Sequence, residues 1–309
     1  MTLENYIEQV KLRIKEYLPT DLDDVEVTVI PREKNNGALF HGISIHHSNE
    51  AVSPLLYAED YFELLKRGMR VGDTLHLMVD NYILARNEIK AQNNIDLSYD
   101  HIKSHLFLSV INAEKNQELL ENIPHQKLED LAVVYRSLVY TDGKQVGSML
   151  INNRLLECWN ADQGEIHKHA LENMGSLFKF QFCGLTQKIF GMLDIPIEEI
   201  PFDQNLFLLG NDQDYYGAAY LNCPDVLQEI SEKMGGDFLI IPSSVHELII
   251  MKDMADIDIG ALIETVREVN RTELTEADFL SDNIYRYDSQ KQALSMLDGN
   301  DMELGMKLQ

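Results

Sequence analysis

The chain has 309 residues, 45% of them hydrophobic and 25% charged, which is the composition of a globular protein with a substantial core. Its 51 acidic and 26 basic side chains give a net charge of −25. This charge opposes binding to nucleic acid phosphates and to anionic membranes, because both are negative. We therefore expect no direct nucleic acid binding and no membrane, and a protein with a basic surface as the partner.

The sequence carries no sign of export or of a disulfide framework. Its three cysteines, Cys158, Cys183 and Cys223, are odd in number and form no Cys-x-x-Cys pair, so reduced thiols are expected. The first residues lack the basic and apolar regions of a signal peptide, and no apolar run approaches the roughly 20 residues that span a bilayer. These features predict a cytoplasmic protein.

The first 90 residues predict helices around a β-hairpin. Apolar residues recur at spacings of four and three over residues 3–17, which indicates one face of a helix that ends before Pro19. Alternating patterns over residues 25–30 and 39–45 flank Asn35-Asn36-Gly37, whose residues tolerate positive φ, so a hairpin is expected. The remaining expected elements are a strand at 51–57, a short acidic helix at 59–63 and a helix at 73–89 capped by Asp73.

The rest of the chain mixes strands and helices without strict alternation. Residues 191–205 form an acidic stretch that contains Pro196 and Pro201 and shows no helical or strand periodicity. We predict a domain boundary there. The class is therefore α+β, with mixed, mostly antiparallel sheets, covering helices and two sub-domains, residues 1–195 and 205–309. Expected strands lie at 105–111, 128–140, 146–151, 206–209, 217–220, 238–241, 245–251, 284–287 and 293–297, and expected helices at 113–121, 162–175, 224–234 and 259–269, the last capped by Asp256 or Asp258.

Residues 235–250 carry the sharpest candidate for chemistry. Two apolar runs predict a β-hairpin, with Pro242-Ser243-Ser244 between them and His246 and Glu247 next. A zinc-protease helix needs a second histidine where Ile250 stands, and a nucleophile elbow needs glycines that flank the serine, so neither motif is present. Two interpretations stay open. One is a turn whose serine hydroxyls bond to the backbone, and the other is a hydrolase or transferase in which His246 and Glu247 activate Ser243 or Ser244.

Other polar clusters fail the tests for metal and phosphate sites. Calcium-loop patterns that begin at Asp212 or Asp253 lack, respectively, the glutamate or the glycine of an EF-hand. There is no glycine-rich phosphate loop, and Arg136 and Arg267 are interpreted as members of structural ion pairs. We therefore expect no metal and no cofactor. Short histidine clusters without thiol or regularly spaced carboxylate partners are His46-His47, His101 with His105, and His167 with His169.

Four segments together resemble a known family. They are residues 112–120 (NAEKNQELL), 130–136 (DLAVVYR), 236–248 (GDFLIIPSSVHEL) and 266–272 (VREVNRT). Over nearly its whole length the chain is similar to DUF5688, a bacterial family of unknown function found mainly in Firmicutes of the gut. The resemblance implies a bacterial cytoplasm. It carries over no activity, because no catalytic or binding residues of the family are assigned.

Without a catalytic motif, the preferred hypothesis is a non-enzymatic protein-binding or regulatory module. The first alternative is the hydrolase or transferase built on Ser243, Ser244, His246 and Glu247. The second is an acidic decoy that mimics nucleic acid toward a basic nucleic-acid-binding protein. The sequence leaves the oligomeric state open.

Overall fold

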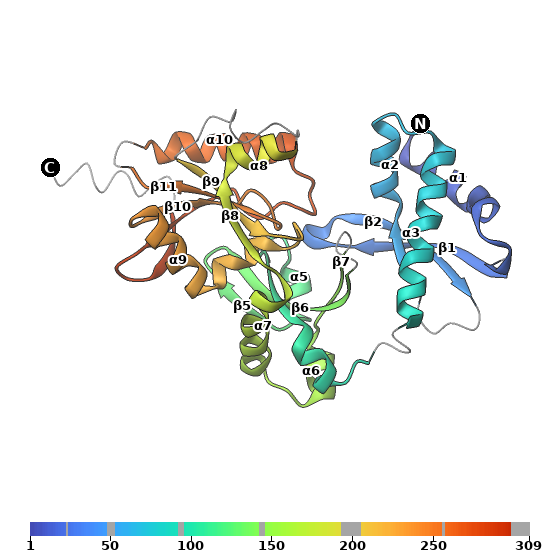
Figure 1. The fold of residues 1–309 in the computed structure, drawn as a ribbon, viewed down its shortest axis with the longest axis horizontal. Helices are drawn as coiled ribbons and strands as arrows, with labels where there is room; N and C mark the ends of the chain where they lie inside the picture. The colour runs from blue at the N-terminus through green and yellow to red at the C-terminus, as the bar shows by residue number, and fades with distance from the viewer. Residues whose placement is uncertain are drawn as a thin grey trace. The chain divides into compact units, whose positions relative to one another are not determined.

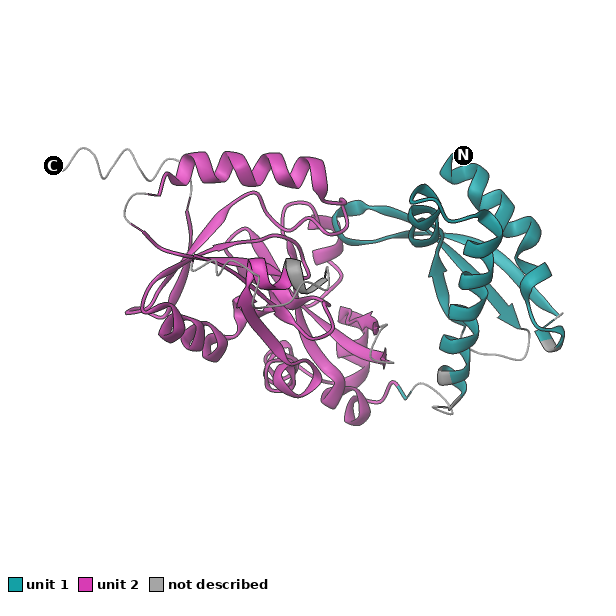
Figure 2. Cartoon of the chain, turned by 45° about the horizontal axis from the view of Figure 1, so that its top comes forward, with its two compact units in different colours: residues 1–96 teal, residues 97–309 magenta. Residues whose placement is uncertain are grey.

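The computed structural model describes residues 1–22, 24–47, 53–91, 96–141, 146–192, 205–254 and 257–297 (Figure 1). The chain divides into two compact units, residues 1–96 and residues 97–309, which Figure 2 colours separately. Both units combine helices with antiparallel sheets, so the predicted α+β class is confirmed. Within the described ranges no helix is both long and apolar enough to cross a bilayer.

Unit 1 (residues 1–96) contains a three-stranded antiparallel sheet and helices. The predicted hairpin is confirmed, because β1 (Val25–Glu33) pairs antiparallel with β2 (Leu39–His47) along its whole length. Between them, Asn36 and Gly37 have φ of 59° and 72°, the left-handed region that these two residue types tolerate. The other elements are α1 (Leu3–Arg13), β3 (Leu55–Tyr57), α2 (Ala58–Lys66) and α3 (Val71–Ala91), with short 3-10 turns at Ile14–Tyr17, Thr20–Leu22 and Asn35–Gly37.

The core of unit 1 lies between its helices and β2. Tyr6 of α1 and Ile43 of β2 are fully buried there, and the Tyr6 hydroxyl donates to Thr74 Oγ1 of α3 at 3.0 Å. The predicted cap of α3 is wrong, because the helix begins at Val71 and Asp73 lies in its first turn. Its carboxylate accepts from the guanidinium of Arg70 at 2.8 Å, so it forms an ion pair instead.

Unit 2 (residues 97–309) contains two antiparallel sheets. In the first, β6 (Leu131–Thr141) is central, with β4 (Leu106–Asn112) on one side and β5 (His125–Leu128) and β7 (Val146–Leu150) on the other. The second sheet has six strands. Their order is β13 (Ala293–Leu297), β12 (Ile284–Asp288), β10 (Phe238–Ile241), β11 (Leu248–Lys252), β9 (Leu206–Asn211) and β8 (Phe180–Gly184).

Two long helices of unit 2, α7 (Gln163–Leu177) and α10 (Ile259–Glu273), begin at aspartate caps. The carboxylates of Asp162 and Asp258 accept from the N–H groups of Glu165 and Ala261, at 2.8 and 2.9 Å. The strand predicted at 217–220 is wrong, because a 3-10 helix, η6 (Gly217–Asn222), stands there. The α-helices are α4 (Tyr99–Ile102), α5 (Gln117–Leu120), α6 (Asn153–Trp159), α7 (Gln163–Leu177), α8 (Leu185–Met192), α9 (Pro224–Met234) and α10 (Ile259–Glu273), and a further 3-10 turn is Lys103–His105.

The six-stranded sheet is buried on both faces. In β10, Leu239 and Ile241 pack with the apolar face of α10, while Phe238 and Ile240 on the other face belong to the main core of the unit. Figure 1 shows α10 lying along one side of this sheet. The continuous apolar run Phe238–Ile241 is therefore explained by burial on two sides.

The division between the compact units falls at residues 96 and 97, not between the predicted domains 1–195 and 205–309. Residues 193–204 of the predicted boundary lie outside the described residues. The strands on either side of it, β8 and β9, pair with each other from Phe180 opposite Asn211 to Gly184 opposite Phe207. An aperiodic, proline-containing stretch in a sequence does not by itself mark a domain boundary, because the boundary depends on which segments pair across it.

Candidate functional site

The four candidate residues from the sequence lie in the connection between β10 and β11. The Ser244 N–H donates to the carbonyl of Glu247 at 3.1 Å, and the Ser244 Oγ accepts from the N–H of His246 at 3.0 Å. Ser244 is 8% exposed, and Ser243 is half-buried. The hydroxyl of Ser244 thus satisfies a backbone donor within a tight turn.

Both ring nitrogens of His246 face groups of the protein. Nδ1 accepts from the N–H of Tyr216 at 3.2 Å, and Nε2 lies 3.4 Å from Oδ1 of Asp278. Since Nδ1 accepts, the proton of the neutral ring resides on Nε2, the nitrogen nearer the Asp278 carboxylate. The backbone of Asp278 also holds this turn, because its carbonyl accepts from the N–H of Val245 at 2.9 Å.

This geometry separates the serine hydroxyl from the imidazole. A nucleophile–base pair needs the hydroxyl within hydrogen-bond reach of a ring nitrogen that can take its proton. Here the Ser244 hydroxyl meets the main chain of His246, and the acceptor nitrogen of the ring is occupied by Tyr216. Among the described residues no hydrogen bond joins the Glu247 carboxyl to Ser244 or to the His246 ring, and burial, followed by the charge of Asp214, raises the pKa of Glu247.

The segment that approaches His246, residues 212–217, has an unusual backbone. Asp214 and Tyr216 have φ of 48° and 50°, a region sparsely populated by residues other than glycine. The buried side chain of Asn211 fixes this segment, because its Oδ1 accepts from the N–H groups of Gln213 and Tyr215, both at 3.1 Å, and its Nδ2 donates to the Tyr215 carbonyl at 2.8 Å. Such over-determined backbone clusters at binding sites.

Arg136 of β6 extends over this segment. Its guanidinium carbon lies 4.6 Å from the centre of the Tyr216 ring, and its Nε donates to Ser148 Oγ of β7 at 2.8 Å. Ser148 Oγ is also bonded to the Tyr215 hydroxyl at 2.8 Å. We call Arg136, Ser148, Tyr215, Tyr216 and His246 the arginine–tyrosine cluster.

The two arginines predicted to form ion pairs differ. Arg267 on α10 pairs with Glu264 at 2.6 Å, as predicted. Arg136 makes no ion pair with any described residue and contacts Tyr216 and Ser148 instead. No local pattern distinguishes the two arginines, because Tyr216, on which the Arg136 guanidinium packs, is about 80 residues away along the chain.

The histidine clusters named above do not converge in the part of the chain that the structure describes. No three His, Cys, Asp or Glu side chains there are grouped so that they could hold a metal ion. His101 and His105 stack on each other at 4.7 Å, and His105 Nδ1 bonds to the carbonyl of His101. His167 faces the Tyr135 hydroxyl at 3.2 Å, and burial lowers the pKa of His167.

A cavity of about 690 Å³ lies elsewhere in unit 2, between α7, β8 and the start of α9. Its wall is mainly apolar, with Phe178 and Tyr220 among the lining residues. Cys223 also lines it, but burial raises the pKa of this thiol to about 12. A thiol of such a pKa is protonated near neutrality, so the cavity offers no thiolate nucleophile.

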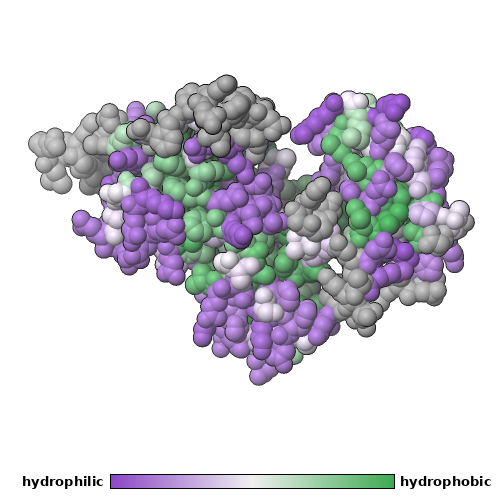
Figure 3. Space-filling model, viewed as in Figure 1, coloured by the Kyte–Doolittle hydropathy of each residue, from purple (hydrophilic) through white to green (hydrophobic). Residues whose placement is uncertain are grey.

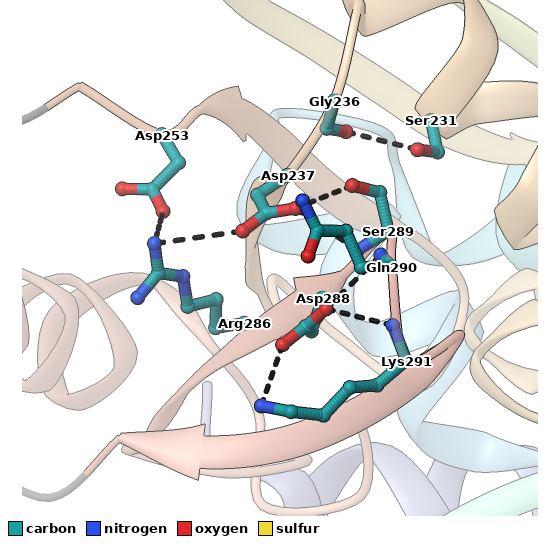
Figure 4. Close-up of polar contacts among 9 residues, drawn as sticks. All are labelled: Ser231, Gly236, Asp237, Asp253, Arg286, Asp288, Ser289, Gln290 and Lys291. Carbon is teal, nitrogen blue, oxygen red and sulfur yellow. Dashed lines mark hydrogen bonds and ion pairs between the residues drawn. The ribbon is translucent and has the colours of Figure 1, made fainter.

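Asp237, near the beginning of the 235–250 stretch, stabilises the six-stranded sheet. Figure 4 shows Asp237, just before β10, bonded through Oδ1 to the N–H and hydroxyl of Ser289, just after β12, at 2.9 and 2.6 Å. Arg286 lies between Asp253 and Asp237, at 2.5 and 3.6 Å. The network therefore ties together the ends of three adjacent strands.

Asp237→Asn is expected to lower the stability of the protein at neutral pH. The bonds from Ser289 lower the pKa of Asp237, so the folded-state pKa lies below the unfolded value of about 3.9. The stabilisation is therefore complete above that value and is lost as pH falls through the folded pKa. Urea unfolding of wild type and variant should show a stability gap at pH 7 that closes in strong acid, whereas Glu157→Gln, on the exposed surface of α6, should show no gap. A gap that persists unchanged in acid would contradict the assignment.

The comparisons with known proteins identify the family. The model of the family of unknown function DUF5688 matches residues 3–289, so the chain belongs to that family. No curated protein and no solved structure matches the chain.

Proposed function

We propose that this member of DUF5688 is a non-enzymatic binding module of a bacterial cytoplasm, which engages a basic protein through the acidic surface of unit 2. The surplus of acidic side chains in unit 2 carries the proposal. Residues 97–309 hold 35 acidic and 16 basic side chains, net −19, whereas residues 1–96 hold 16 and 10, net −6. Figure 3 shows hydrophilic side chains over much of the visible face of unit 2. A negative field of this kind attracts a basic surface and speeds its association.

One surface segment is suited to such contacts. Glu114, Glu118 and Glu121 lie within eight residues of one another between β4 and β5, are all exposed, and form no ion pair with any described residue. We call these three residues the acidic turn. The neighbouring Lys115 is neutralised by Glu276 at 2.5 Å. The three carboxylates are thus available to lysines or arginines of a partner.

The geometry of the serine candidates supports a binding role over catalysis. Ser244 bonds to backbone groups, and the imidazole of His246 is held between Tyr216 and Asp278. A hydrolase or transferase at this turn would require both side chains to leave these partners. The non-enzymatic hypothesis requires no rearrangement.

The test measures binding of a lysine-rich peptide to the full-length protein. We expect E114Q/E118Q/E121Q to weaken the binding several-fold in low salt, because each exposed charge contact contributes about 0.2–1 kcal/mol. Raising the salt from about 0.05 M to about 0.5 M should remove most of the difference, since the screening length becomes shorter. Isothermal titration calorimetry measures both effects.

The matched control removes three exposed carboxylates from unit 1. D24N/E26Q/E33Q changes the net charge by the same amount and should leave the binding nearly at the wild-type value. Equal weakening by both triple variants would show that net charge, rather than unit 2, determines the binding, and would overturn the proposal. The decoy hypothesis predicts in addition that duplex DNA competes with this protein for binding to a DNA-binding partner.

A further inference from the structure

An arginine without a carboxylate is unexpected in this chain. Acidic side chains outnumber basic ones by 51 to 26, so a guanidinium would readily find a partner on the protein itself. Arg267 and Arg271 on α10, for example, pair with Glu264 and Glu268 at 2.6 and 2.7 Å. Among the described residues, Arg136 makes one hydrogen bond, from Nε to Ser148 Oγ, and one stacking contact, with Tyr216.

These two contacts orient the guanidinium and leave its terminal Nη groups for another acceptor. The Tyr216 ring supports one face of the guanidinium, and Ser148 fixes the inner Nε edge. Arg136 is partly buried, and its Nη atoms are not among the fully buried polar atoms that lack a hydrogen-bond partner. A planar fork held in this way matches a carboxylate or phosphate group, which accepts two parallel hydrogen bonds.

The surroundings are rigid in a way that suits a preformed site. Ser148 is bonded to the Tyr215 hydroxyl, and Tyr216 is held by its N–H bond to His246 Nδ1. Phe107 of β4 lies directly opposite Arg136 in the sheet. The centre of its ring is 6.3 and 6.4 Å from the ring centres of Tyr215 and Tyr216. The position of Arg136 is thus fixed by β4, β6, β7 and the 212–217 segment, so a ligand would pay little ordering entropy.

We infer that Arg136 is the anchor of an oxyanion subsite, which binds the carboxylate or phosphate group of a small ligand. The subsite is independent of the acidic turn and of the basic partner proposed above. Tyr216 and Ser148 are positioning residues, which orient the guanidinium of Arg136.

The test titrates the full-length protein with inorganic phosphate and, separately, with succinate at matched ionic strength. The side-chain Nε–Hε resonance of Arg136 in a ¹⁵N spectrum reports binding directly. We expect it to shift saturably with at least one of the two anions, and the two titrations distinguish a phosphate site from a carboxylate site. R136Q should weaken the binding at least about tenfold, because hydrogen bonds to charged groups contribute about 1.5–3 kcal/mol.

Two further variants separate a specific site from general effects of charge. R154Q removes an exposed arginine on α6 of the same unit and should bind the anion like wild type. S148A keeps the charge of Arg136 but removes the hydroxyl that orients it, and should weaken binding by a smaller factor. Circular dichroism checks that each variant is folded, and the Arg136 resonance in the wild-type protein tests the site even if R136Q is not. The inference is overturned if neither anion shifts that resonance, or if R136Q and R154Q bind equally.

Discussion

Gly217→Ala is expected to destabilise unit 2 by about 1–3 kcal/mol, the usual cost of overpacking a close-packed site. A Cβ at this position would lie 2.5 Å from the carbonyl oxygen of His246 and 2.8 Å from the Cα of Gly210. Both obstacles are main-chain atoms, so no side chain can rotate away to make room. The backbone of β9, of η6 or of the His246 turn must move instead.

The effect of Gly217→Ala can be followed by the fluorescence of Trp159, which is the single tryptophan of the chain and lies in unit 2. A domain of this size loses about 2–4 °C in Tm for each kcal/mol, so a fall of several degrees is expected. Gly175→Ala is the matched control. It lies within α7 with no atom within 4 Å of the added Cβ, and should be neutral or stabilising by about 0.5–1 kcal/mol. An unchanged Tm for Gly217→Ala would mean that the close approach does not exist.

Asp130→Ala should destabilise unit 2 by about 2–5 kcal/mol. Asp130 stands in the turn between β5 and β6, and its carboxylate accepts from the hydroxyls of Ser281 (2.6 Å) and Tyr285 and from the Nδ2 of Asn283 (3.0 Å). Ser281 and Tyr285 are fully buried, so removal of the carboxylate leaves two buried hydroxyls without this acceptor. Each such loss costs about 1–3 kcal/mol.

This contact links the two sheets of unit 2, since Asp130 lies beside β6 and Tyr285 lies in β12. Burial, and after it the charge of Asp130, raises the pKa of Tyr285, so its phenol stays protonated and donates. The double-mutant cycle with Tyr285→Phe is the decisive measurement. The loss of unfolding free energy in Asp130→Ala/Tyr285→Phe should be smaller than the sum of the losses in the single variants. The reason is that the double variant lacks the phenol hydroxyl that Asp130→Ala alone leaves without its acceptor. Strict additivity, measured by urea unfolding, would contradict a direct bond.

Much of the local structure could be predicted from residue patterns. Alternation predicted β1 and β2, and Asn36 with Gly37 predicted their turn, because these preferences act over a few neighbouring residues. The strand predicted at 217–220 failed for a non-local reason. Gly217 lies against Gly210 and the His246 carbonyl, and this close packing is invisible in the segment itself.

The candidate site shows the same limit. The sequence singled out Ser244 and His246 as neighbours and offered both a turn and a catalytic pair as interpretations. It could not find Asp278, which faces the imidazole, or Tyr216, which occupies Nδ1, because both come from other segments. It also assigned Arg136 to an ion pair on the rule that buried charges are paired, whereas a tyrosine face and a hydroxyl hold it.

Composition and the periods of two and 3.6 residues were enough to predict the α+β class, the acidic charge and most helices and strands. The division into two units, the partners of Asp130 and His246, and the contacts of Arg136 with Tyr216 and Ser148 became visible only in the folded chain. These features depend on strand pairing and side-chain bonds that join residues tens to more than a hundred positions apart. A local pattern fixes which face of an element is apolar, but not which distant segment comes to lie against it.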